Sequence, residues 1–238
     1  MDFRNKVVFV AGGTGGLGRG VTRAFLAAGA TVMVTYVVAA EFDALKSETA
    51  QTAAAALVGV MTDVTDQSAV EKVVADIVAK YGQIDILVNT VGAYAGGKSL
   101  WDTEVRTYDQ MLQLNLKAGF VLARAIVPVM IRQNRGWVVN IASKAAVDHA
   151  AGGGLYEASK AGALALFDSL AADVKQYNIN VNSILPSIID TPANRSAMPK
   201  ADFSKWPKPE EIASVILFLC SEEARVIHGA AIPVYGKT

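Results

Sequence analysis

A tyrosine and a lysine four residues apart could act together in proton transfer. Tyr156 and Lys160 lie at the start of a stretch with helical periodicity, and residues at this spacing project from the same face of a helix. A phenol has an ordinary pKa of about 10, so it exchanges protons poorly at neutral pH, and a nearby ammonium stabilises its phenolate form. Such pairs also arise by chance on exposed helices, so the spacing alone is a weak signal.

A serine strengthens the assignment. Ser143 lies thirteen residues before Tyr156, just past the apolar run Trp137 to Ile141. The end of this strand and the start of the helix are expected to converge, so that the hydroxyl orients a substrate oxygen toward Tyr156. Local proton transfer of this kind contributes roughly 10² to 10⁴ in rate. Asn115, in the middle of a long apolar helical stretch, is either a hydrogen-bonded core amide or a further site residue.

A glycine-rich turn predicts a dinucleotide site. It follows the first apolar run and opens the first helix, the context in which glycines let the backbone approach a pyrophosphate and direct free N–H groups at it. Two registers fit, Gly13-Gly15-Gly18 and Gly12-Gly16-Gly18, and an ordinary tight turn is the competing interpretation. The expected cofactor contacts here are Gly12, Thr14, Gly15, Gly16, Leu17 and Gly18.

The choice between NAD and NADP depends on the end of the second strand. An acid there binds the ribose hydroxyls of NAD and repels a 2′-phosphate. This strand ends Thr35-Tyr36-Val37, with neither an acid nor an arginine, so Tyr36 could hydrogen-bond either cofactor and the balance leans to NADP. Asp63, with Val64 beside it, could accept the adenine amino group, whereas Asp66 is the better candidate for a helix N-cap.

The wider pattern predicts one doubly wound α/β domain over residues 1–238. Apolar runs alternate with helical stretches, which is typical of a mostly parallel sheet covered on both faces. Pro128 is expected to bend or interrupt the helix Glu104 to Gln133, and residues 187–208 are expected to form a lid over the site. Seven strands are predicted: Lys6–Ala11, Thr31–Val37, Leu57–Val60, Ile84–Val88, Trp137–Ile141, Ile179–Leu185 and Ala231–Val234. The segment Asn89, Val91 and Gly92 closes the fourth strand at the carboxyl end, where ligands bind in open α/β sheets.

Composition excludes several classes of protein. The chain has 22 Lys and Arg against 22 Asp and Glu, so no net field attracts nucleic acid or an anionic membrane. Cys220 is the only cysteine and lies in an apolar run, which excludes an internal disulfide and argues for a core residue. No metal site is expected. The N-terminal residues do not resemble a signal peptide or a membrane span, so we expect a soluble cytoplasmic protein.

These motifs, in this order and over essentially the full length, resemble the short-chain dehydrogenase/reductase family. The resemblance implies a catalytic tetrad of Asn115, Ser143, Tyr156 and Lys160, in which Lys160 also holds the nicotinamide ribose and Asn115 positions a water. It further implies that Pro186, the Ile189 backbone and Thr191 contact the nicotinamide end, and that the chain forms a homotetramer or homodimer through its two long helices. Ala11, Thr90, Val91 and Ser187 depart from the usual family residues.

The expected function is NAD(P)-dependent reduction of a ketone to a secondary alcohol, or the reverse, on a 3-oxoacyl or small cyclic substrate. The stretches 93–97 and 190–206 resemble quinonoid dihydropteridine reductase, which makes pterin reduction an alternative, although the serine and the missing acid differ from that enzyme type. A non-catalytic dinucleotide-binding sensor is a third possibility. Tyr94 and His149 are expected near the substrate, together with Ser143 and Tyr156.

Overall fold

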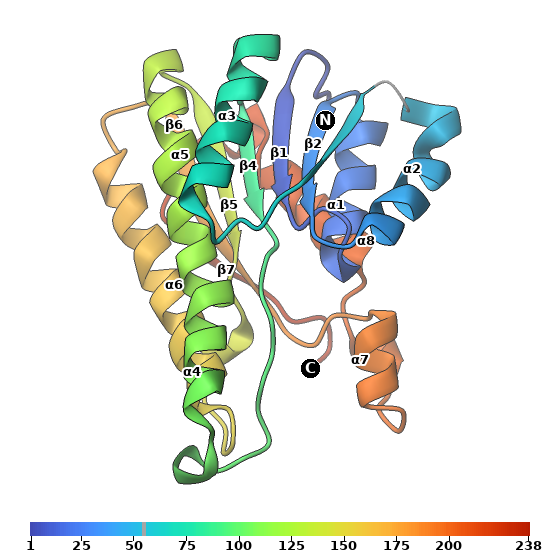
Figure 1. Ribbon diagram of the computed structural model, residues 1–238, viewed down its shortest axis with the longest axis vertical. Coiled ribbons are helices and arrows are strands. Elements are labelled where there is room, and N and C mark those ends of the chain that lie inside the picture. Colours follow the sequence, from blue (N-terminus) through green and yellow to red (C-terminus); the bar gives the residue numbers. More distant parts are fainter. Residues whose placement is uncertain (54–55) are drawn as a thin grey trace.

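One parallel sheet of seven strands runs through the protein, in the order β3-β2-β1-β4-β5-β6-β7 (Figure 1). The computed structural model describes the backbone of residues 1–53 and 56–238 and the side chains of residues 1–50 and 56–238. The strands are β1 (Val7–Ala11), β2 (Thr31–Tyr36), β3 (Leu57–Met61), β4 (Ile86–Asn89), β5 (Gly136–Ile141), β6 (Ile179–Pro186) and β7 (Ala231–Val234). The predicted fold class is confirmed, and each predicted strand lies within two residues of an observed one.

Helices cover both faces of this sheet (Figure 1). They are α1 (Gly16–Ala27), α2 (Ala39–Ala53), α3 (Gln67–Tyr81), α4 (Val105–Leu112), α5 (Ala118–Gln133), α6 (Gly154–Asp173), α7 (Pro192–Ala197) and α8 (Pro209–Leu219). Helices α1, α2 and α8 pack on one face in a first core, and α3, α5 and α6 pack on the other face in a second core.

The apolar strand sequences follow from this double cover. In β1, Val8 and Val10 point into the first core, whereas Val7, Phe9 and Ala11 point into the second. Successive side chains of a strand alternate between faces, so a strand buried on both sides must be apolar throughout.

The long helix is interrupted at a different place from the one expected. A π-helical segment, η2 (Gln113–Lys117), separates α4 from α5, while α5 continues through Pro128. Both Pro128 and Arg124, whose carbonyl would have accepted the missing hydrogen bond, are exposed, so the ring points away from the core and water can satisfy the carbonyl. The expected interruption at Pro128 is therefore wrong, whereas the alternative of a bend stays a prediction.

The run Val105–Gln133 is also apolar enough to cross a membrane by length and composition, with a mean hydropathy of 1.6. Half of its most apolar window is buried inside the protein. The α5 residues Val121, Leu122 and Ile126 belong to the second core, so this run serves as a core helix of the fold.

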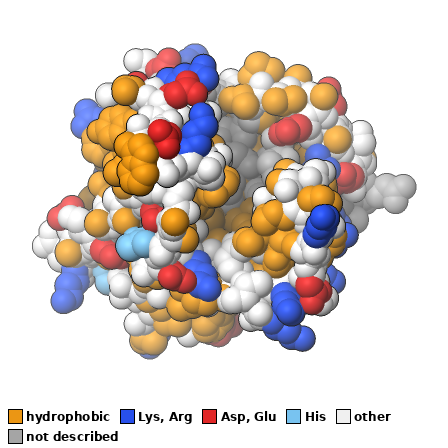
Figure 2. Space-filling model, turned by 90° about the horizontal axis from the view of Figure 1, so that it is seen from below, with side chains coloured by type: hydrophobic (Ala, Val, Ile, Leu, Met, Phe, Trp, Pro, Cys, Tyr) orange, Lys and Arg blue, Asp and Glu red, His pale blue; other side chains and the backbone are white. Residues whose placement is uncertain are grey.

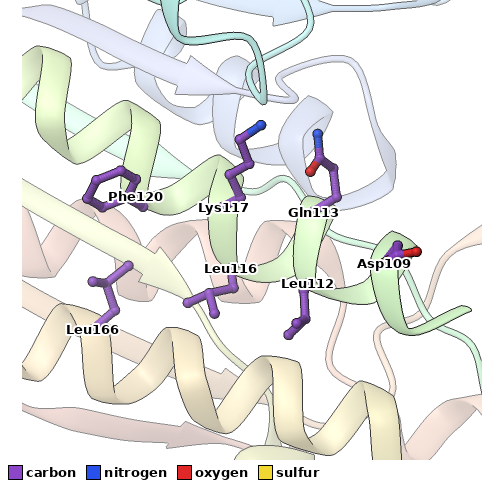
Figure 3. Close-up of a pocket in the computed structure, with 7 residues that line it drawn as sticks. All are labelled: Asp109, Leu112, Gln113, Leu116, Lys117, Phe120 and Leu166. Carbon is purple, nitrogen blue, oxygen red and sulfur yellow. The ribbon is translucent and has the colours of Figure 1, made fainter. Parts of the chain in front are cut away.

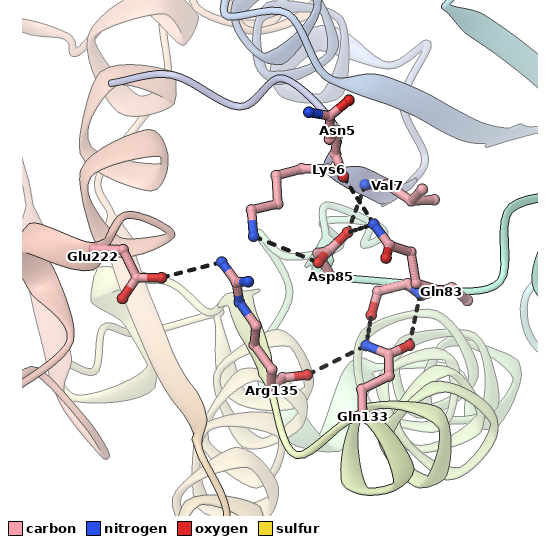
Figure 4. Close-up of polar contacts among 9 residues, drawn as sticks. Asn5, Lys6, Val7, Gln83, Asp85, Gln133, Arg135 and Glu222 are labelled. Atoms are coloured by element: carbon pink, nitrogen blue, oxygen red, sulfur yellow. Dashed lines mark hydrogen bonds and ion pairs between the residues drawn. The ribbon is translucent and has the colours of Figure 1, made fainter.

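A polar network fixes the amino edge of the sheet (Figure 4). The buried Asp85 accepts a 2.8 Å hydrogen bond from the backbone N–H of Val7 and lies 3.7 Å from the Lys6 ammonium. Gln133, at the end of α5, accepts from the N–H of Ile84 and donates to its carbonyl. The starts of β1 and β4 and the end of α5 are thereby tied together, at the edge opposite the glycine-rich turn.

The carboxyl edge carries the segments with predicted chemistry. The glycine-rich turn follows β1, residues 89–92 end β4, Ser143 follows β5, and the segment after β6 contains α7. Helices α4 and α7 both lie below this edge in Figure 1, on opposite sides of it. The predicted N-cap is confirmed, because Asp66 accepts a hydrogen bond from the N–H of Ala69, and Cys220 is a buried core residue as expected.

Candidate active site

Lys160 is buried beneath the start of α6. Its ammonium donates a 2.9 Å hydrogen bond to the carbonyl of Ile141, the last residue of β5. Burial lowers the pKa of this lysine from 10.5 to about 8, because the charged form is taken out of water. A lysine with such a pKa can gain or lose a proton near neutral pH.

Tyr156 lies one helical turn before Lys160 and meets Ser143. Burial raises the pKa of the Tyr156 phenol, and the neighbouring Ser143 hydroxyl acts in the opposite direction by stabilising the phenolate. The Ser143 hydroxyl also accepts a hydrogen bond from the N–H of Ala145, which fixes its position at the start of the short helix η3 (Lys144–Ala146). The phenol, the serine hydroxyl and the buried lysine therefore share the carboxyl edge of β5.

Asn115 reaches the same place from the π-helical segment. Its Oδ1 accepts from the N–H of Ala93, and its Nδ2 donates to the carbonyl of Ala93 and to Ser159 Oγ. A Cβ on Gly92 would lie 2.7 Å from Asn115 Oδ1 and 3.0 Å from Lys160 Nζ, so the backbone at Gly92 passes directly against both groups. Irregular π turns are frequent at functional sites.

Sequence reasoning missed Ser159. This fully buried hydroxyl donates to the Tyr156 carbonyl at 2.7 Å and accepts from Asn115 Nδ2 at 3.0 Å, so it joins η2 to α6 behind the site. Its only signal in the sequence was a small polar residue next to Lys160.

The glycine-rich turn has the shape of an anion cradle. Gly12 has a φ of +71°, and a Cβ on Gly18 would collide with the Gly12 carbonyl. A Cβ on Gly16 would lie 2.9 Å from the methyl group of Thr191, which brings the segment after β6 against the turn. None of the described side chains caps the N-terminus of α1, whose first N–H groups have no partner within the helix, so the cradle suits a pyrophosphate.

The other predicted cofactor residues lie around the same edge. Asn89 donates to Asn140 on β5 and accepts from the N–H of Val91, so it links β4 to β5. The Ile189 carbonyl accepts from the side chain of Asn194. Thr191 caps α7 through the N–H of the same Asn194.

The adenosine side of the turn holds three residues of interest. Asp63 Oδ1 accepts from both the N–H and the hydroxyl of Thr65, whereas Val64 is buried in the second core. The Tyr36 ring is stacked on Phe42 at 4.7 Å between centroids.

The two expected substrate contacts lie in different surroundings. The exposed Tyr94 ring packs edge-on against Tyr156, with centroids 4.9 Å apart, and borders a cavity of about 340 Å³ that Leu155 also lines. His149 is exposed, lies 3.5 Å from the Glu157 carboxylate, and does not line this cavity. Figure 2 views this end of the molecule and shows the surface hollowed near its centre.

Among the residues whose side chains are described, no group of three or more His, Cys, Asp or Glu is placed to hold a metal ion. The arrangement of groups at this edge is one of hydroxyls, an amide and an ammonium. Such groups can transfer protons and bind an anion.

Comparisons with known proteins agree with this geometry. The family model for short chain dehydrogenases matches residues 6–202. The 3-oxoacyl-[acyl-carrier-protein] reductase FabG of Thermotoga maritima is 32% identical over an alignment of 244 positions, which covers 99% of this chain and 98% of the relative. The NAD-dependent glycerol dehydrogenase of Listeria innocua is 34% identical over 248 residues, which cover 99% and 94%.

A solved structure extends the likeness to three dimensions. The crystal structure of levodione reductase superposes with a TM-score of 0.92 at 27% identity, covering 98% of this chain and 97% of the other. Fold, site and relatives together place the chain in the short-chain dehydrogenase/reductase family, as an oxidoreductase acting between CH–OH and C=O groups.

Proposed function

We propose that this protein uses a nicotinamide dinucleotide to reduce a ketone to a secondary alcohol, or to catalyse the reverse oxidation. The observation that carries the proposal is the placement of the Ser143 hydroxyl beside the Tyr156 phenol, with Lys160 buried behind them and the glycine cradle at the same edge. A bound nicotinamide supplies or accepts the hydride.

The chain's own residues manage the proton. In reduction, Tyr156 Oη gives its proton to the substrate oxygen, which Ser143 Oγ holds by a hydrogen bond. The Lys160 ammonium favours the phenolate that remains, because an opposite charge nearby stabilises an anion. In the oxidation direction the same phenolate accepts the alcohol proton. Asn115 completes the tetrad as the residue that positions a water for proton relay.

We assign the cofactor contacts from their positions along the same edge of the sheet. The glycine cradle holds the pyrophosphate, Lys160 the nicotinamide ribose, and the segment after β6 the nicotinamide end. The full assignment comprises Gly12, Thr14, Gly15, Gly16, Leu17, Gly18, Tyr36, Asp63, Val64, Asn89, Val91, Gly92, Tyr156, Lys160, Pro186, Ile189 and Thr191. Residues 187–208 act as the lid, since Thr191 already packs on Gly16.

The substrate is a 3-oxoacyl compound or a small cyclic ketone. The relatives named above include a 3-oxoacyl reductase and a levodione reductase, and the cavity of about 340 Å³ beside Tyr94 adjoins the Tyr156 ring. His149 is exposed and apart from this cavity, so Tyr94 and Leu155 are the stronger candidates for substrate contact.

The long helices offer a surface for self-association. A groove of about 470 Å³ runs between η2 and α6, and its apolar lining includes Leu112, Leu116, Phe120 and Leu166 (Figure 3). We expect a second copy to cover it, giving a homodimer or homotetramer in the cytoplasm. Light scattering on the purified protein measures this directly, and a monomer at micromolar concentration contradicts it.

A tyrosine substitution tests the proposed chemistry. Tyr156→Phe removes only the phenol oxygen, so turnover of a ketone panel should fall by roughly 10² to 10⁴ while dinucleotide affinity stays unchanged. Tyr81→Phe, at the end of α3, is the matched control and should retain turnover. Unchanged turnover in Tyr156→Phe refutes the role of the phenol. A wild-type protein that binds dinucleotide yet turns over no ketone and no quinonoid dihydropterin is a sensor instead of an enzyme.

A further inference from the structure

We propose that Glu41 makes this protein select NAD(H) over NADP(H). The inference rests on the proposed function, because it assumes that the glycine cradle holds a dinucleotide. Glu41 lies in α2, five positions beyond the end of β2. The end of the strand itself has no acidic residue.

Glu41 reaches the glycine-rich turn directly. The hydroxyl of the buried Thr14, inside the turn, donates a 2.9 Å hydrogen bond to Glu41 Oε2. In dinucleotide folds the adenosine ribose lies between this turn and the end of the second strand. A carboxylate that bridges these two elements is placed to accept hydrogen bonds from ribose hydroxyls.

The neighbouring residue holds the start of α2 in place. The Phe42 ring is stacked on Tyr36, the last residue of β2, with an interplanar angle of 1°. The ring also lies against Gly59 of β3, where a Cβ would collide with it. Because Phe42 is held between β2 and β3, the backbone of Glu41 is fixed relative to the cradle.

Positive charge that would favour a 2′-phosphate is engaged elsewhere. Arg19, in α1, forms a 3.0 Å ion pair with Glu48 of α2. The strand end Thr35-Tyr36-Val37 is uncharged, and among the described side chains no Lys or Arg forms a hydrogen bond or ion pair with Thr14 or Glu41. A 2′-phosphate here would meet a carboxylate without a compensating cation.

Glu41 reverses the expectation that the cofactor is NADP. That expectation rested on the missing acid at the end of β2, because an acid there would repel the 2′-phosphate. Glu41 restores that repulsion from the following helix. A phosphate of charge about −2 at roughly 6 Å from a carboxylate in a water-like medium loses about tenfold in affinity.

Direct binding of NADH and NADPH, measured by fluorescence titration at fixed ionic strength, tests the inference. The wild type should bind NADH at least about tenfold more tightly than NADPH. Glu41→Gln should reduce this ratio by about tenfold, and Glu41→Arg should reverse the preference. Asp43→Asn, which makes the same charge change two residues along the same helix, should leave the ratio unchanged.

The outcomes separate this inference from the proposed function. If both dinucleotides bind and support turnover but the ratio is the same in wild type and Glu41→Gln, the role of Glu41 is overturned and the enzyme stands. A wild type that prefers NADPH also overturns it. If neither dinucleotide binds to the wild type, the proposed function itself fails and Glu41 has no cofactor to select.

Discussion

The wild-type fold contains a buried ammonium at Lys160. Compared with the wild type, Lys160→Met should therefore be relatively more stable at neutral pH than at alkaline pH. The folded-state pKa is about 8, against an ordinary value of 10.5, so burial of the charge costs about 3 kcal/mol below pH 8. Between pH 8 and 10.5 the unfolded chain binds more protons than the folded chain. The free energy of unfolding of the wild type therefore rises with pH across this window.

The measurable quantity is the difference between wild type and Lys160→Met at two pH values. Between pH 7 and 9.5 the free energy of unfolding of the wild type should rise by about 2 kcal/mol relative to that of Lys160→Met. The constant cost of losing the hydrogen bond to the Ile141 carbonyl cancels in this comparison. Urea unfolding followed by tryptophan fluorescence gives both free energies, and Lys175→Met, an exposed lysine just beyond α6, is the control.

Parallel pH dependence in wild type and Lys160→Met would refute the reasoning, because it would mean that the ammonium is as well solvated in the folded protein as in the unfolded chain. The control should show no pH-dependent difference from wild type. Loss of turnover in Lys160→Met at all pH values is expected in either case.

Two further substitutions address the site. In Ser143→Ala the pKa of Tyr156 should rise, because the hydroxyl that opposes the effect of burial is lost. The kcat/KM for alcohol oxidation should then fall by roughly 10² to 10⁴, and the rising limb of its pH profile should move to higher pH. An unshifted limb argues against the contact. In Gly18→Ala the new methyl group meets the Gly12 carbonyl, so we expect at least about tenfold weaker dinucleotide binding and a loss of about 1–3 kcal/mol in stability. Gly162→Ala, where the nearest side chain is at 3.5 Å, is the control.

Much of the architecture could be predicted because burial on both faces leaves a direct mark on composition. A strand such as β1, which contacts both cores, must be apolar at every position, and this pattern is visible without coordinates. The grouping of Ser143 with Tyr156 was predictable for a related reason. Ser143 follows the end of β5 and Tyr156 lies in the first turn of α6, and the strand end and the helix start meet at the carboxyl edge of a parallel sheet.

The features that could not be predicted depend on three-dimensional neighbours. Pro128 lies on the exposed side of α5, and the solvent can satisfy the carbonyl it leaves free, which the sequence does not reveal. The contact from Glu41 to Thr14 joins residues 27 apart, and nothing in their spacing predicts it. Ser159 likewise gains its place only because η2 packs against α6.

The π-helical turn at residues 113–117 sets how α4 and α5 are rotated relative to each other about the helix axis. This turn holds one residue more than a regular helical turn. Side chains in the turn can therefore face the site while those of α5 face the core. Because the π-helical turn absorbs the extra residue, deleting a single residue there would restore regular hydrogen bonding and leave α4 and α5 in nearly the same relative phase. The change would fall on the turn itself: Asn115 would move away from the tyrosine and lysine while Val121, Leu122 and Ile126 stayed in the core, so such a deletion should cost more activity than stability.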